Sequence, residues 1–321
     1  MKYVALFLTV GITTLTCSEE RGPQFGFSKS ARLEMNKNWD LSINANFNEY
    51  AVSQDSMEIA FPYLFGYLFS PSSSSINGPA VVFDSNYKAG FQVGFLLNTP
   101  YDKWCFGGEY EWFRSSVALS KSGGGLLSYT SPFFVNSSAH SFGSFTSKWN
   151  VGIDLIDLYL TRPYYSGKRV SVSPFIGLRG NLIRQHFSLD SAVEFAKGRS
   201  NSWGVGPSLG ARGNGVLKFG FSLFGNLATS LLYTRYTEIG LDYADSVFAR
   251  NNNVGTLRPI LESGMGLKWA RGNISLDVAY NFLVFFSQNM IKGLVSTASL
   301  EQAAYGNLYL QGVSVGGSII F

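Results

Sequence analysis

Two histidines are the residues of this chain that could take part in hydrolytic chemistry. His186 is followed closely by Ser188 and Asp190, and a histidine near a hydroxyl and a carboxylate is the least that a hydrolase requires. No second acidic cluster accompanies this group, and His140 stands among serines. We therefore interpret both histidines as solvated loop residues and assign no catalytic residue. The chain is not expected to be an enzyme, and an outer-membrane hydrolase is the less favoured alternative.

Composition argues against a metal centre and against a nucleic-acid partner. Two cysteines and two histidines are too few for a zinc cluster. The formal net charge of +4 comes from 25 basic and 21 acidic residues, and no five like charges occur in a row. We expect no metal, no cofactor and no nucleic acid.

A larger set of charged side chains lies in stretches where apolar and polar residues alternate. If these stretches are strands of a membrane barrel, their polar face lines the lumen. A water-filled lumen of mixed charge would pass small hydrophilic solutes with weak selectivity and a slight anion preference. The alternative is an interior filled by paired side chains, without a pore. The predicted pore-lining residues are Lys88, Glu109, Glu111, Arg179, Arg212, Lys218, Arg258, Glu262 and Asp277.

Arg179 and Arg212 allow a more specific hypothesis. They fall on neighbouring predicted strands, where both guanidinium groups could lie on one wall and attract anions. Structural ion pairing with Glu109 or Glu262 is the alternative interpretation.

The alternation predicts the elements that would position these side chains. From Trp39 to Phe47 the odd positions are apolar, and from Asp40 to Asn48 the even positions are polar. Such alternation recurs ten times and predicts an all-β, antiparallel up-and-down transmembrane barrel with its apolar face outward. In the stretch from Trp149 the apolar phase shifts between Leu155 and Ile156, which predicts a β-bulge.

Connection lengths support the barrel independently. Long gaps (about 52–86, 114–147, 187–201, 237–256 and 288–305) alternate with short ones (98–102, 161–168, 213–215 and 270–273). Outer-membrane barrels have long extracellular loops and short periplasmic turns. Ten strands follow, or twelve if 56–68 or 126–135 also pairs.

Aromatic residues near the predicted strand ends indicate two membrane interfaces. The predicted interface residues are Trp39, Trp104, Trp112, Trp149, Trp203 and Trp269. The chain ends on Phe321 in an alternating stretch, which is typical of the signal that the barrel-assembly machinery recognises.

The N-terminus reads as an export signal. Met1 and Lys2 give a short positive region, and an apolar stretch of about 13 residues follows. We expect residues 1–18 to be a cleaved signal peptide, 19–38 a periplasmic segment and 39–321 the barrel. Cys105 would then be the single cysteine of the mature chain, so no intramolecular disulfide is expected.

Three ordered stretches resemble a known family. They are YKAGFQVGFLLNTPYDKWCFGGEYEWF (87–113), SVSPFIGLRGNLIRQ (171–185), and WGVGP (203–207) followed by GFSLFGNLATSLLY (220–233). This pattern is similar to the Legionella-type major outer membrane proteins, pore-forming proteins that also occur in chlamydia-related bacteria. The resemblance implies a porin-like channel and an abundant surface protein.

The function expected from these observations is passive diffusion of small hydrophilic solutes and ions across a Gram-negative outer membrane. Expected partners are outer-membrane lipid, the barrel-assembly machinery and the solutes, and the long loops could bind a host or surface ligand. A surface adhesin, or a structural barrel with a plugged lumen, is the alternative, because the loops are rich in Ser, Asn, Gly and Phe.

Overall fold

The computed structural model describes residues 39–55, 57–64, 75–76, 79–100, 103–123, 127–131, 143–166, 169–192, 195–243, 246–251, 253–290 and 306–321. The predicted signal peptide, the predicted periplasmic segment and His140 lie outside the described residues. In the described part of the chain, no helix is long and apolar enough to span a membrane.

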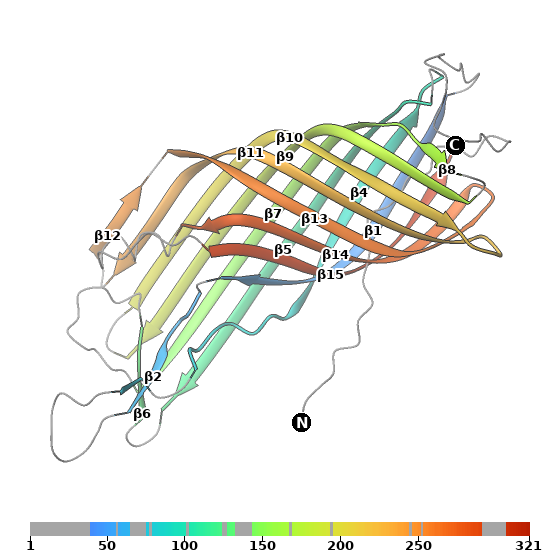
Figure 1. Cartoon of the computed structure of the whole chain (residues 1–321). Coiled ribbons are helices and arrows are strands. Elements are labelled where there is room, and N and C mark those ends of the chain that lie inside the picture. The colour runs from blue at the N-terminus through green and yellow to red at the C-terminus, as the bar shows by residue number, and fades with distance from the viewer. Residues whose placement is uncertain are drawn as a thin grey trace, which may run out of the picture.

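Ten long antiparallel strands of the described residues form a closed barrel (Figure 1). Each pairs with its neighbours in chain order, and β1 closes the barrel against β15 from Ser42↔Ile320 to Gln54↔Leu308. This confirms the predicted ten-stranded up-and-down barrel. The strands are β1 (Asp40–Gln54), β4 (Tyr87–Asn98), β5 (Cys105–Ser122), β7 (Ser144–Thr161), β9 (Val170–Ser191), β10 (Phe195–Val216), β11 (Phe221–Tyr243), β13 (Val254–Arg271), β14 (Ile274–Asn289) and β15 (Gly306–Ile320).

Short strands lie outside this ring. β8 (Tyr164–Ser166) pairs antiparallel with the first residues of β9, and β12 (Ser246–Asn251) pairs antiparallel with the last residues of β11. β2 (Phe61–Leu64) pairs with β3 (Ser75–Ile76) and β6 (Leu127–Thr130) in a separate small sheet at the end of the barrel opposite the C-terminus (Figure 1). The two segments that could have given twelve barrel strands therefore pair with each other instead.

At the end with the short turns, the barrel shows the predicted orientation of its two faces. On β1, Ser42, Asn44 and Asn46 are buried inside, whereas Ile43 and Phe47 are 48% and 58% exposed on the outer face. A lipid-facing surface requires exposed apolar side chains. The predicted outward direction of the apolar face is thus confirmed in this half.

In the other half of the barrel the polarity is inverted. On β7, Trp149, Val151, Ile153 and Leu155 are all buried inside. The pairing of β7 with β5 and β9 runs without a shift, so the predicted bulge after Leu155 is wrong. The strand keeps one phase, and its inward positions change from apolar to polar along its length. This part of the barrel resembles a soluble β-barrel, with an apolar interior and a polar exterior.

The inversion also explains why the strands are longer than expected. β9 and β10 have 22 residues each, and only residues 192–194 connect them, where a long gap from 187 to 201 was predicted. About ten residues of a tilted strand suffice to cross the membrane. These strands therefore extend beyond the membrane on the loop side of the barrel.

Cys105 is buried, with its Sγ 3.6 Å from Asn98 Oδ1. The other cysteine of the sequence, Cys17, lies outside the described residues, so the single cysteine of the mature chain stays a prediction.

Candidate functional site in the barrel interior

Two arginines join distant walls of the barrel near its centre. Arg179 on β9 binds Asp157 on the adjacent β7 (Nε–Oδ1 2.7 Å) and Glu262 on β13 (Nη2–Oε2 2.5 Å). Arg212 on β10 binds Glu109 on β5 (Nη2–Oε1 2.9 Å). The side chains of both arginines are less than 10% exposed. The interpretation of Arg179 and Arg212 as structural ion-pair partners of Glu262 and Glu109 is therefore confirmed.

Polar neighbours hold the two carboxylates in place. Tyr159 Oη donates a hydrogen bond to Glu109 Oε1 at 2.7 Å, and Gln92 Nε2 donates to its Oε2 at 3.2 Å. Asn226 Nδ2 donates to Glu262 Oε1 at 3.0 Å. A buried charge is tolerated only when it is paired and hydrogen-bonded, and these contacts meet that condition.

Two aromatic rings contact the guanidinium group of Arg212. Its centre lies 4.3 Å from the Tyr159 ring and 5.0 Å from the Phe175 ring, which are cation–π distances. Because Tyr159 also donates to Glu109, one residue orients both members of this ion pair.

Space inside this cluster is small. A polar cavity of about 20 Å³, room for about one water molecule, lies between the charged groups. The residues lining it are Tyr50, Gln92, Glu109, Glu111, Asp157, Arg179, Glu262, Asn281 and Leu283. The centre of the barrel is therefore filled by side chains in this conformation.

The remaining predicted pore-lining residues are distributed over different levels. Glu111 faces the central cavity and accepts a hydrogen bond from Asn48. Asp277 is buried opposite Lys268 in the β13–β14 register. Lys88 and Arg258 are half-buried on inward positions of β4 and β13, near the other end of those strands. Lys218 is exposed in the turn between β10 and β11, so its prediction as a pore-lining residue is wrong.

Two interior residues of this site were missed by the sequence analysis. Asp157 and Tyr159 are inward positions of β7 that the predicted pore-lining set did not include. The lipid-facing phase predicted after the bulge, with Ile156 and Leu158 outward, already placed both of them inward. Asp154, assigned to the lumen if the bulge followed it, instead lies on the outer face with Arg114 (2.7 Å) and Tyr110 (2.9 Å).

An apolar layer fills the barrel beyond the ion pairs, toward the loops. The connection between β1 and β4 contributes to this apolar layer, because its residues Met57, Ile59 and Ala60 are buried there. Phe83 from the same connection stacks on Trp149 with ring centroids 5.9 Å apart. The connection thus acts as a plug, defined here as residues 57–60 and 81–83, that packs into the barrel mouth.

The structure places five of the six tryptophans on the outer face and one inside. Trp39 and Trp104 are exposed by 59% and 39%, and Trp112, Trp203 and Trp269 are half-buried at outward positions. Trp112 stacks on Phe91 at 5.4 Å, and Trp203 meets Tyr233 edge-to-face at 6.4 Å. Trp149 is 2% exposed and packs in the interior, so its prediction as an interface residue is wrong.

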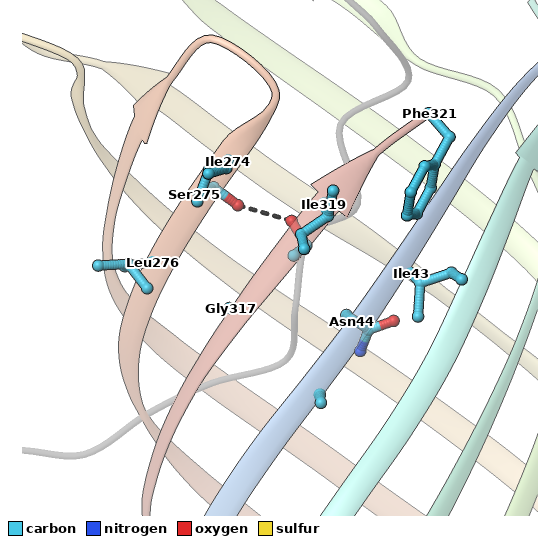
Figure 2. Close-up of a pocket in the computed structure, with 10 residues that line it drawn as sticks. Ile43, Asn44, Ile274, Ser275, Leu276, Gly317, Ile319 and Phe321 are labelled. Atoms are coloured by element: carbon cyan, nitrogen blue, oxygen red, sulfur yellow. Dashed lines mark hydrogen bonds between the residues drawn. The ribbon is translucent and has the colours of Figure 1, made fainter.

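Phe321 lies at the seam that closes the barrel. Figure 2 shows its ring beside Ile43 of β1, and its backbone N–H donates to the Leu41 carbonyl at 2.9 Å. The Ser275 and Ser318 hydroxyls are 2.6 Å apart and link β14 to β15 on the inner face. The outer face of this seam carries an apolar hollow, and Ile43, Gly317 and Ile319 are among the residues that line it (Figure 2). The C-terminal residue thus completes the pairing of the last strand with the first.

His186 lies on the outer face of the barrel wall. It stands opposite Asn150 of β7 and Arg199 of β10 in the strand register and is exposed. Among the described residues no group of three or more His, Cys, Asp or Glu is placed to hold a metal ion.

Comparison with known proteins identifies the family. The family model described as the Legionella pneumophila major outer membrane protein precursor matches residues 12–321. The chain belongs to the Legionella major outer membrane protein family. Membership in this family, together with the closed barrel, places the protein in the outer membrane. A search of curated proteins found no matching relative.

The chain is also similar, at low sequence identity, to several solved structures. The OmpT protease of Escherichia coli is 8% identical with a TM-score of 0.44, covering 91% of this chain and 99% of its own. Ail of Yersinia pestis is 9% identical with a TM-score of 0.27, covering 88% and 98%. An anion-selective porin from Comamonas acidovorans is 11% identical with a TM-score of 0.24, covering 88% and 99%.

Proposed function

We propose that the protein is an outer-membrane channel for small hydrophilic solutes and ions whose lumen is closed in this conformation. The observation that carries the proposal is the charged cluster in the barrel interior, described above. Apolar side chains of similar volume stabilise a core at least as well as buried ion pairs do. A need for stability alone therefore does not account for charged groups at this level, whereas passage of hydrophilic solutes does.

Two layers would close the proposed channel. The Arg179 and Arg212 bridges cross the lumen at its centre, and the plug packs against Trp149 at the mouth. Opening requires the bridges to separate and the plug to move. Neither step breaks a strand pairing of the barrel.

The charges at the central cavity suggest the ion preference. Four carboxylates (Glu109, Glu111, Asp157 and Glu262) meet two guanidinium groups there. We therefore propose a cation preference in place of the slight anion preference inferred from the sequence. The positive charge of Lys218 lies outside the lumen, whereas the negative charge of Asp157 lies inside it.

Single-channel recording in planar bilayers tests the proposal. We expect small, infrequent conductance steps for the refolded wild type. Arg179→Ala with Arg212→Ala should enlarge the steps and shift the reversal potential across a salt gradient toward cation selectivity. The control pair Arg212→Met with Glu109→Gln removes one bridge without changing the net charge, so it should enlarge the steps with a smaller shift. A second control, Arg169→Ala with Arg271→Ala, removes two exposed cations and should leave both properties unchanged. Folded barrels that give no steps in any variant would refute the channel.

A structural barrel that presents its surface loops is the second candidate. The plug favours it, because an apolar core at the mouth rigidifies the loop end and forms a stable platform. In this case deleting the loops abolishes binding to a surface ligand, and no variant conducts.

A further inference from the structure

The outer face of β9 and β10 changes from apolar to basic at one level of the barrel. On β9, Ile176, Leu178 and Leu182 are 62%, 58% and 40% exposed, and the next outward positions are Arg184 and His186. On β10 the outward positions change from Leu209 and Val205 to Arg199. The change occurs just beyond Trp203 and Tyr233, an aromatic pair of the kind found at membrane interfaces.

The height of the apolar part agrees with the thickness of a membrane. From Val172 to Leu182 the strand advances ten residues, which at about 3.3 Å per residue and about 45° tilt spans roughly 23 Å. This is close to the roughly 25 Å apolar band of outer-membrane barrels. The basic residues therefore stand at the level of the lipid headgroups on the loop side.

The strand register gathers these cations around His186. Arg199 is directly opposite His186 on β10, Arg184 is two residues away on β9, and Lys148 of β7 is on the diagonal beside Ser188. Opposite and diagonal positions of an antiparallel sheet are about 5 to 8 Å apart. Arg184, Arg199 and Lys148 can thus converge on one group, and we name this set the basic patch.

The Arg114 side chain occupies the space beside Gly152 on this face. Gly152 separates Arg114 from Arg184 in the register, and a Cβ added to Gly152 would lie 3.1 Å from Arg114 Cδ. The Arg114 side chain therefore covers Gly152 and is held there by Asp154.

Acidic residues offset only part of this charge. Glu238 lies 3.5 Å from Arg199 in an exposed pair, and exposed pairs of this kind are weak. Asp242 stands opposite Lys197, and Asp190 lies on the diagonal from Lys148. In the described part of the chain neither Lys148 nor Arg184 forms an ion pair.

We propose that the basic patch binds the phosphate groups of an anionic lipid in the outer leaflet. A surface that continues upward from the lipid-contacting face meets lipid headgroups, and guanidinium and ammonium groups are the usual partners of phosphate. The site lies outside the barrel, so the proposal does not depend on whether the lumen conducts.

Binding of lipid A to the purified full-length barrel in neutral detergent tests the proposal. Lipid A carrying two phosphates should bind the wild type, and binding should weaken as salt increases. Lys148→Gln, Arg184→Gln and Arg199→Gln together should weaken binding about tenfold or more, because charge-assisted hydrogen bonds are lost. The single variant Arg184→Glu should weaken it as well and keeps the test available if the triple variant does not fold.

A matched control removes the same charge at the other end of the barrel. Arg169, Lys218 and Arg271 are exposed near the short turns, and their replacement by Gln should leave lipid A binding unchanged. Retention of the folded form is checked by heat-modifiable migration. Equal loss of binding in patch and control variants, or no loss in either, would overturn the proposal. Displacement of lipid A by inorganic phosphate alone would also overturn it, because the site would then take free phosphate and not a lipid.

Discussion

Arg212 on β10 and Glu109 on β5 form an ion pair of 2.9 Å although β9 and β7 stand between their strands in the closed sheet. Because the two strands are three positions apart in the sheet, the side chains can meet only by reaching across the barrel interior. The pair therefore joins two walls of the barrel, and Arg179 with Glu262 joins β9 and β13 in the same way. Closure of the lumen and stability of the wall depend on the same side chains.

Arg179→Ala should destabilise the barrel strongly. The change leaves Asp157 and Glu262 without their buried cation, and loss of one partner of a buried pair costs about 3 to 5 kcal/mol. Urea unfolding of the refolded barrel in lipid vesicles measures the effect. Arg199→Ala is the control, because its 3.5 Å pair with Glu238 is exposed, and it should cost about 1 kcal/mol or less. Equal costs for the two variants would contradict the interior role.

Gly177→Ala should also destabilise the barrel. A Cβ at Gly177 would collide with the Leu158 carbonyl and the Tyr159 backbone, and overpacking of this kind costs about 1 to 3 kcal/mol. Gly180, three residues along the same strand, has only contacts of 3.8 Å and longer. Gly180→Ala should therefore be close to wild type in the same unfolding assay, and the reverse order would show that the strand packing is different.

Trp149 should behave as a core residue and not as an interface residue. Among variants that each retain one tryptophan, brominated lipid should quench Trp203 and leave Trp149 unquenched, because Trp149 is buried inside. Trp149→Ala should cost about 3 to 5 kcal/mol, as for large buried aromatics. Quenching of Trp149 as strong as that of Trp203 would place its ring in the lipid.

Phe83→Ala should loosen the plug. The change removes the ring that stacks on Trp149 and contacts Phe187, so the barrel mouth loses an apolar contact. If the lumen conducts as proposed, swelling of proteoliposomes in small sugars should become faster. Val82→Ala serves as the control, since Val82 is 51% exposed and its loss should change nothing. A Phe83→Ala rate equal to that of wild type would show that the plug does not gate the lumen.

Much of this fold is encoded in the period-two pattern of the sequence. The strand positions, the antiparallel order, ten strands and the outward apolar face near the short turns were all predicted, because a strand in a membrane must separate lipid from lumen at every second residue. The charged residues on the polar face were predicted to point into the barrel. The structure buries five of them there: Glu109, Arg179, Arg212, Glu262 and Asp277.

Other features were decided by tertiary structure. Alternation defines two faces of a strand but not which face meets lipid, since that depends on the height of each residue above the membrane. Trp149 and Val151 alternate like lipid-facing residues, yet they lie above the apolar band, where water makes the inward face the apolar one. The partners of Arg179 and Arg212 likewise depend on barrel closure and strand stagger, which bring residues 83 and 103 positions apart into contact. The sequence by itself determined the wall and its two faces, and only the closed structure determined which residues meet across the lumen.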